Sequence, residues 1–164
     1  MKITDSSCLI CIFVEIEKPF ILLNWIKRGY KIVIPHQIFK ELQKNKKTFE
    51  KVKPKINEGL ITLQKLINEE DIIKFRNRHP QLGKGEISVI LTAIMLNKQK
   101  KRYYAVIDDK NARKIAQKYN IQLTGTYGLL KTLNDKKVIS KKEFTDCKKA
   151  MQDSKFRINF DKIK

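Results

Sequence analysis

The segment that decides the fold is 103–128, YYAVIDDKNARKIAQKYNIQLTGTYG. It begins with a short apolar run, 103–107, which stops at two adjacent aspartates. A segment with helical spacing of apolar residues follows over 109–119, and a second short apolar run covers 121–123. Such short runs are typical of strands that are buried on both faces. The strand–helix–strand order therefore predicts two parallel strands joined by a right-handed crossover.

The same alternation continues toward both ends of the chain. Short apolar runs predict three more strands, at 1–4, 30–34 and 60–63. Helical spacing, capping residues and stop signals predict further helices from Ser6 or Ser7 to Ile16, and at Phe20–Lys27, Pro35–Leu42, Glu86–Leu96 and Thr126–Leu133. Strands that alternate with helices define an α/β protein. We therefore predict a three-layer α/β/α domain with a central, mainly parallel sheet of about five strands.

The length and composition suit one domain that folds in water. The chain has 164 residues, of which 41% are hydrophobic and 32% are charged. This share of apolar residues offsets the entropy lost on ordering the chain, which excludes an intrinsically disordered protein. No linker rich in Gly, Ser or Pro divides the sequence. We predict a single domain over 1–164, with a helical, basic cap over 135–164 in which Val138, Ile139 and Phe144 face inward.

Two further features exclude other classes of protein. No stretch reaches the roughly 18 consecutive apolar residues of a membrane-spanning helix, and the first residues do not form a secretory signal. We therefore expect a cytoplasmic protein with no membrane partner. Cys8 and Cys11 lie among apolar residues, which predicts buried core cysteines rather than a redox pair or half of a zinc site.

The charge balance favours a polyanionic partner. Lys and Arg number 36 against 17 Asp and Glu, which leaves a formal net charge of +19. A field of this sign attracts nucleic acids. A lysine-rich proteome would also make many proteins basic, so the charge by itself gives the nucleic-acid interpretation only a modest advantage.

Acidic side chains are scarce and fall at informative positions. Asp5 ends the first predicted strand, and Asp108 and Asp109 end the fourth. In an open parallel sheet, groups at the carboxyl ends of strands near the switch point share one crevice. Glu41 lies beside the apolar face of its predicted helix, and Glu86 lies in the first turn of another, where matching the helix dipole is the ordinary explanation.

A group of carboxylates repels itself unless a cation compensates it. With Mg²⁺ or Mn²⁺ it forms a hard-oxygen site that can bind phosphate and activate water. The sequence contains no Ser–His or Cys–His arrangement that would supply a different nucleophile. A divalent-cation site for phosphodiester hydrolysis is therefore the interpretation that the acids favour.

Several quoted segments carry a resemblance to a known family. They are ITDSSCLI (3–10), IPHQIFKEL (34–42), LGKGEISVILTA (82–93), AVIDDKNARKIAQKYNIQLTGTYGLL (105–130) and the tail KKVISKKEF…SKFRINFDKI (136–163). Together they resemble the PIN-domain proteins, metal-dependent ribonucleases that include the VapC-type toxins of toxin–antitoxin modules. Segments 82–93 and 105–130 are most similar to a prokaryotic, often archaeal, subgroup of nucleic-acid-binding PIN proteins, and the tail is similar to the ending of that subgroup. No single segment is specific to this family, but the order of the segments along the chain is.

The resemblance implies roles for individual residues. The catalytic acids it implies are Asp5, Glu41, Glu86 and Asp108, with Asp109 as an alternative fourth acid; Glu86 stands where many members have Asp. The metal ligands are then drawn from Asp5, Glu86, Asp108 and Asp109. Substrate-binding positions are expected at Ser6, Thr124 and Thr126, and at Lys40 and Lys44, which would contact phosphates without reading bases.

The function implied by the resemblance is an Mg²⁺- or Mn²⁺-dependent endoribonuclease that acts on RNA, with a role as the toxin of a type II module as one expectation. An antitoxin protein and a second copy of the chain are its expected protein partners. The alternative is a nucleic-acid-binding PIN-fold protein without catalysis. A haloacid-type hydrolase needs an aspartate two residues after Asp5, where Ser7 stands, and a receiver domain needs an acidic pair after the first strand, so both are disfavoured.

Overall fold

A computed structural model describes residues 1–65 and 67–154 of the chain. Within them, five strands form one parallel sheet in the order β3-β2-β1-β4-β5. The strands are β1 (Lys2–Thr4), β2 (Ile32–Pro35), β3 (Ile61–Gln64), β4 (Tyr104–Val106) and β5 (Leu123–Thr124). The predicted α/β class and parallel sheet are confirmed.

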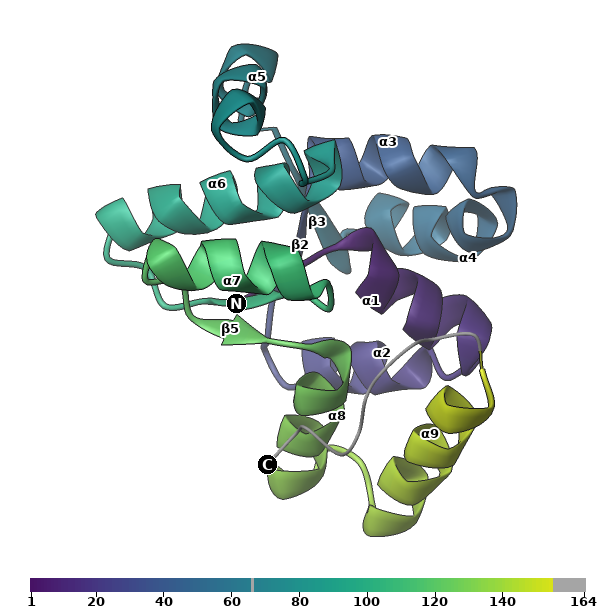
Figure 1. The fold of residues 1–164 in the computed structure, drawn as a ribbon. Coiled ribbons are helices and arrows are strands. Elements are labelled where there is room, and N and C mark those ends of the chain that lie inside the picture. The colour runs from purple at the N-terminus through teal and green to yellow at the C-terminus, as the bar shows by residue number, and fades with distance from the viewer. Residues whose placement is uncertain (66, 155–164) are drawn as a thin grey trace.

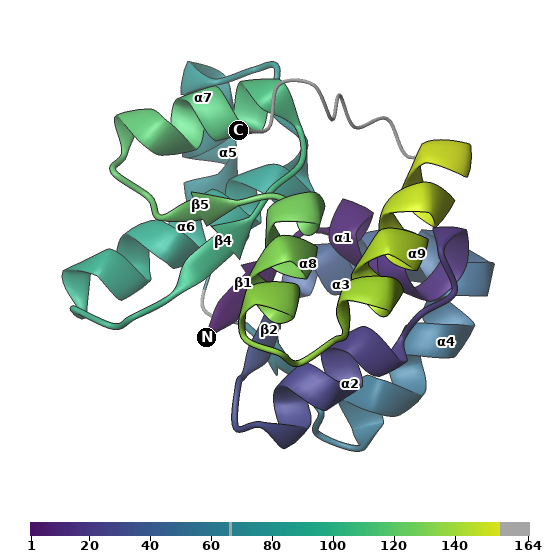
Figure 2. The ribbon, with the colours of Figure 1, turned by 90° about the horizontal axis from the view of Figure 1, so that it is seen from below.

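Helices cover both faces of the sheet (Figure 1), with α6 and α7 on one side and α2 and α8 on the other. The chain runs through α1 (Ser6–Ile10), the π-helical turn η1 (Cys11–Glu15), α2 (Phe20–Lys27), α3 (His36–Lys44), α4 (Lys46–Asn57), α5 (Glu69–Arg78), α6 (Lys84–Lys98), α7 (Lys110–Lys118), α8 (Thr126–Asp135) and α9 (Lys141–Asp153). Seen from below, α8, α9 and α2 lie nearest the viewer and the sheet lies behind them (Figure 2). This is the three-layer α/β/α arrangement that the sequence predicted.

The order of the strands creates a switch point between β1 and β4. The chain moves outward from β1 through β2 to β3, and then returns to the other side of β1 to form β4 and β5. Lys2 pairs with Tyr104 and Thr4 with Val106, so the two central strands end at the same level. Open α/β sheets bind their ligands outside the carboxyl ends of the strands at such a point.

The core consists of the strands and the inner faces of the helices. Ile3, Ile34 and Val106 are fully buried, as expected for parallel strands that are covered on both faces. In α6 the residues Ile87 and Ile90 are also fully buried, because the helix packs against the sheet and against α3 and α5. The central strands and their helices therefore form a rigid base for the residues at the switch point.

Several predicted boundaries were wrong for local reasons. The helix predicted to run to Ile16 widens after Ile10 into the π-helical turn η1. Helix α3 extends to Lys44, two residues beyond the predicted end at Leu42, and the side chain of Asn45 then caps α4. Helix α5 was not predicted. In the C-terminal region, α9 is capped by Ser140, so Val138 and Ile139 lie before the helix, although both are buried.

Helix α9 packs against α8 and η1, and it buries Cys147 and Met151. The rest of the predicted cap, 155–164, lies outside the described residues. Cys8, Cys11 and Cys147 are free and buried, which confirms the prediction of core cysteines for the first two. No helix among the described residues has the length and apolar character needed to span a membrane.

Candidate active site at the carboxyl ends of strands β1 and β4

Asp5 begins α1 directly after β1 and is buried. One carboxylate oxygen, Oδ1, accepts a hydrogen bond from the backbone N–H of Cys8 at 3.0 Å, which makes Asp5 the N-cap of the helix. The other oxygen, Oδ2, accepts from the backbone N–H of Asp108 at 3.3 Å. The carboxylate of Asp5, after β1, thus contacts the backbone after β4 across the switch point.

Asp108 follows β4 and is held by the first residue of α8. The backbone N–H of Thr126 donates to Asp108 Oδ1 at 2.8 Å, and the Thr126 hydroxyl donates to Oδ2 at 2.5 Å. Gly125 permits this approach, because a Cβ atom at that position would lie 2.9 Å from Asp108 Oδ1. Arg113 donates to the carbonyl of Ile107 at 2.8 Å. Burial raises the pKa of Asp108, and the positive charge of Arg113 opposes this effect.

The environment of these two aspartates disfavours their charged forms. Burial, followed by the charge of Asp108, raises the pKa of Asp5 to about 8. Burial also raises the pKa of Asp108, against the lowering effect of its hydrogen bonds from Thr126. Two carboxylates that share a desolvated position cannot both ionise without cost unless a cation joins them.

Glu41 reaches the same place from α3. Its Oε2 accepts a hydrogen bond from the Ser6 hydroxyl at 2.8 Å, and its Oε1 accepts from the backbone N–H of Gly85 at 2.9 Å. A Cβ at position 85 would lie 2.3 Å from Glu41 Oε1, so only glycine permits this contact without displacement. Helices α1, α3 and α6 are therefore joined at one point by a single carboxylate.

Glu86 and Asp109 are helix-capping residues at the edge of the group. Glu86 Oε2 accepts from the backbone N–H of Gly83 at 2.8 Å, at the start of α6. Asp109 Oδ1 accepts from the backbone N–H of Ala112 at 2.8 Å and caps α7. Burial is the largest cause of a raised pKa at Glu86, and the charges of Asp109 and Glu41 add to it.

These acids form one connected group, which we call the acidic cluster: Asp5, Glu41, Glu86, Asp108 and Asp109. The backbone N–H of Asp108 donates a hydrogen bond to Asp5. The hydroxyl of Ser6, the residue after Asp5, donates to Glu41. Glu41 also accepts from the backbone of Gly85, which precedes Glu86. The charge of Glu86 also raises the pKa of Asp5. Residues more than a hundred positions apart in sequence thus share one electrostatic environment.

The donor chemistry of the cluster suits a hard divalent cation, although its geometry is not that of a closed metal cage. Among residues 1–65 and 67–154, no three His, Cys, Asp or Glu side chains are placed so that they could hold a metal ion. Mg²⁺, however, is commonly bound through one or two carboxylates and keeps several waters. Asp5 and Asp108 fit that mode, because each of their oxygens accepts only one of the hydrogen bonds described above and each oxygen has lone pairs to spare.

The other nucleophilic side chains nearby do not offer an alternative chemistry. Cys8 is fully buried, and burial together with the charges of Asp108 and Asp5 raises the pKa of its thiol well above the usual range. A thiolate is therefore strongly disfavoured there. His79 lies 3.0 Å from the Tyr119 hydroxyl, and His36 stacks on Phe39.

The residues predicted to contact phosphate differ in their surroundings. Lys40 lies 3.6 Å from Glu69, and Lys84, which sequence reasoning did not select, lies 3.4 Å from the same carboxylate. Lys44 is exposed at the end of α3. Thr124 does not contact the acidic cluster in any hydrogen bond that we observe; its hydroxyl donates to Gly125 O at 3.3 Å and it lines a pocket described below.

Sequence reasoning did not select Arg113, Gly85 or Gly125 as individual site residues. The sequence did not identify Glu41 as the partner of Gly85. Arg113 follows Asp108 on the next helix, and an arginine in that position carries no distinguishing pattern. Ser6 and Thr126, which were selected, both hydrogen-bond acids of the cluster.

The five-stranded parallel sheet between two layers of helices defines a three-layer α/β/α domain. A family model described as a PIN domain matches residues 1–164, so the chain belongs to the PIN-domain family. No curated protein and no solved structure matches the chain. PIN domains are generally nucleases and typically use divalent metal ions.

Proposed function

We propose that this PIN-domain protein is an Mg²⁺- or Mn²⁺-dependent endoribonuclease that hydrolyses phosphodiester bonds in RNA at the acidic cluster. The observation that carries the proposal is the contact between Asp5 and Asp108 at the switch point. Both carboxyls have raised pKa values because they are buried. Their charged forms are restored when a divalent cation compensates them.

The residues of the cluster have separable roles in this proposal. Asp5 and Asp108 would hold the ion, which when bound supplies positive charge to the phosphodiester and activates water. Thr126 fixes the orientation of the Asp108 carboxylate through two hydrogen bonds. Glu41 fixes the first turns of α1 and α6 relative to each other and presents a carboxylate beside the reacting group.

The positive charge of the chain supports a nucleic acid as the substrate. The net charge is +19, and the cations Lys40 and Lys84 are the sequence neighbours of Glu41 and Gly85. Both cations lie near Glu69, in exposed ion pairs that contribute little to stability. RNA phosphates can replace Glu69 as their partner at small cost, and these contacts would position the backbone without reading bases.

The test is cleavage of RNA by the purified protein. We expect single-stranded or structured RNA to be cut internally in the presence of Mn²⁺ or Mg²⁺, and EDTA to stop the reaction. Binding with a steep salt dependence but no cleavage with either ion would support instead the alternative of a non-catalytic nucleic-acid-binding protein. A toxin role, an antitoxin partner, a homodimer and a cytoplasmic location remain predictions.

A second test uses the glycine beneath Glu41. We expect Gly85→Ala to lower the rate of RNA cleavage by about 10- to 100-fold, because the new methyl group displaces the Glu41 carboxylate, and a misplacement of about 1 Å can cost 10²-fold. The loss of the Gly85 hydrogen bond is partly offset by the better helix propensity of Ala, so the change in melting temperature should be small.

Gly83→Ala is the matched control for this variant. A Cβ at position 83 would lie at an ordinary 3.6 Å from Glu86 Oε2, so the acids should stay in place. Cleavage rates that fall equally in Gly83→Ala and Gly85→Ala would show that the position of Glu41 does not matter for the reaction.

A further inference from the structure

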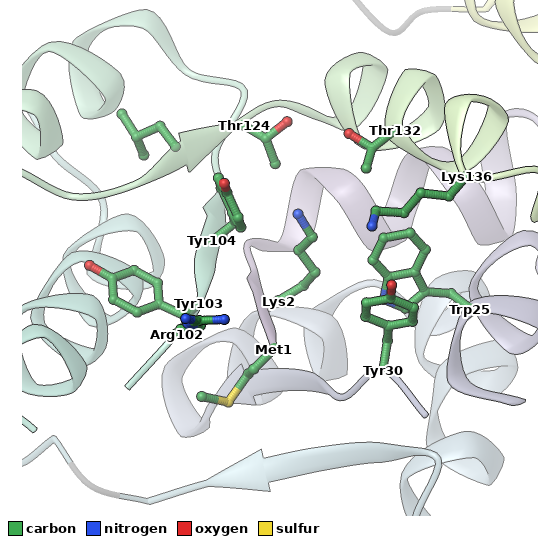
Figure 3. Close-up of a pocket in the computed structure, with 11 residues that line it drawn as sticks. Met1, Lys2, Trp25, Tyr30, Arg102, Tyr103, Tyr104, Thr124, Thr132 and Lys136 are labelled. Carbon is green, nitrogen blue, oxygen red and sulfur yellow. The ribbon is translucent and has the colours of Figure 1, made fainter. Parts of the chain in front are cut away.

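A second polar site lies on the face of the sheet that α2 and α8 cover. A pocket of about 360 Å³ is lined by residues from the start of β1 and β4, from α2 and from the end of α8. The residues that matter here are Lys2, Trp25, Tyr30, Tyr104 and Lys136 (Figure 3). Its volume is within the range of about 300–1,000 Å³ that is typical of small-molecule sites.

Two ammonium groups meet in this pocket without an acid. Figure 3 shows Lys2 and Lys136 pointing into the same space, between Tyr104 on one side and Trp25 and Tyr30 on the other. Lys2 is only 7% exposed, and no carboxylate forms an ion pair with it or with Lys136 among the described residues. Buried charges in proteins are normally paired, and Lys2, unlike the exposed Lys136, is a buried charge without an acidic partner.

The surroundings of Lys2 disfavour its charged form. Burial, followed by the nearby charge of Lys136, lowers the pKa of Lys2 to about 8. Its Nζ lies 4.1 Å from the centre of the Tyr104 ring and 5.7 Å from that of Trp25. These cation–π contacts stabilise the ammonium group, but they do not neutralise it.

The aromatic walls indicate what kind of anion the pocket accepts. Trp25 and Tyr30 pack with their ring centres 4.0 Å apart, and Tyr104 is 47% exposed although it is a large aromatic residue. The buried indole N–H of Trp25 has no hydrogen-bond acceptor among the described residues. Exposed aromatic faces beside cations are the features on which nucleobases stack and phosphates bind.

The pocket is separate from the acidic cluster. Lys2 begins β1 and Asp5 follows its end, and three residues of strand at about 3.3 Å each place them about 10 Å apart. No acid of the cluster lines the pocket. The inference below therefore does not depend on the proposed nuclease function.

We propose that this pocket binds a nucleoside monophosphate group, with the phosphate between Lys2 and Lys136 and the base against the exposed ring of Tyr104. The group could be a free nucleotide or the 5′-phosphorylated end of an RNA strand, since both present the same chemistry. Inorganic phosphate would contact only the two lysines, and an unphosphorylated nucleoside would contact only the aromatic ring.

Trp25 gives a direct readout, because it is the single tryptophan of the chain. Titrations of the full chain in EDTA should show a change in tryptophan fluorescence with AMP or UMP, and at least about tenfold weaker binding of adenosine and of inorganic phosphate. EDTA keeps the acidic cluster free of divalent cations, so cleavage does not interfere. A failure of the nuclease proposal would leave this result unchanged.

Variants locate the binding. We expect Lys136→Ala and Tyr104→Leu each to weaken AMP binding at least about fivefold, whereas Lys131→Ala, which removes an exposed cation of α8 outside the pocket, should have no effect. We expect Lys2→Met to abolish AMP binding. The melting temperature of this variant shows whether it folds. If Lys2→Met does not fold, Lys136→Ala provides the test.

The sources of the phosphate are separated with short RNAs. Tighter binding of a 5′-phosphorylated strand than of AMP would identify an RNA end as the ligand, and equal or weaker binding would identify the free nucleotide. The proposal is overturned if AMP does not bind at millimolar concentration, if phosphate alone binds equally well, or if Lys131→Ala weakens binding as much as Lys136→Ala.

Discussion

Asp5→Asn is expected to reduce metal-dependent RNA cleavage by about 10²- to 10³-fold and to leave the fold intact. The amide oxygen can still accept from the Cys8 N–H at the start of α1, whereas the amide NH₂ replaces the Oδ2 that accepts from the Asp108 N–H, and the negative charge is lost. Loss of one preorganised charged group at a reacting centre commonly costs this much in rate. Asp108→Asn should have a similar effect, because the two carboxylates act as a pair.

The control for this experiment is Asp135→Asn, an exposed aspartate at the end of α8. Its cleavage rate should equal that of the wild type at the same salt concentration. RNA cleavage that persists undiminished in Asp5→Asn would mean that the activity comes from a contaminant or from a different part of the molecule.

The pH dependence of stability is the second large expected effect. The pKa of Asp5 is raised from 3.8 to about 8 in the folded state, so the native protein binds a proton there that the unfolded chain releases. Linkage then predicts that the free energy of unfolding falls as pH rises from about 4 through about 8 in the absence of divalent cations. Asp108, whose pKa is also raised, contributes in the same direction.

The measurement is the difference in melting temperature between wild type and Asp5→Asn across this pH range in EDTA. Subtraction removes groups that act in the opposite direction in this range, such as His36, whose pKa is lowered mainly by burial. The wild type should lose several degrees relative to the variant, since about 1 kcal/mol corresponds to about 2–4 °C for a chain of this size. Parallel curves would contradict the raised pKa.

Addition of Mg²⁺ or Mn²⁺ extends the same experiment. A cation that binds the folded state between Asp5 and Asp108 should restore the melting temperature of the wild type at pH 8, because binding to the native state alone stabilises it. Asp5→Asn should respond much less. An equal response in both proteins would place any bound cation elsewhere.

The pattern of short apolar runs determined the class of fold. The strand–helix–strand segment 103–128 predicted β4, α7 and β5, and the structure contains all three with shifts of a few residues at their ends. Boundaries were less predictable where the backbone depends on a neighbour. The π-helical η1 occurs where α4 packs against the first helical segment, a contact that no local pattern reports.

Asp5, Asp108 and Asp109 were selected from their positions after strands. Glu86 was selected from the first turn of a helix, and Glu41 from its position beside an apolar helix face. The contacts that these acids make were not predicted. The sequence did not show that Glu41 accepts from Gly85, that Thr126 holds Asp108 with two bonds, or that Asp109 faces its own helix. The Glu41–Gly85 contact joins residues 44 positions apart, and the contact between Asp5 and Asp108 joins residues 103 positions apart, so both depend on how the layers pack.

What the sequence determined by itself is the alternation of strands and helices, and the placement of scarce carboxylates where strands end, because both follow from local spacing and burial preference. Tertiary structure alone decided which charges meet. It brought Asp5 to Asp108 across the switch point, and it gathered Lys2 and Lys136 among aromatic rings at the far end of the same strand. The physical reason is that desolvation and charge–charge repulsion depend on distance in space, and the distances here are set by the order of strands in the sheet.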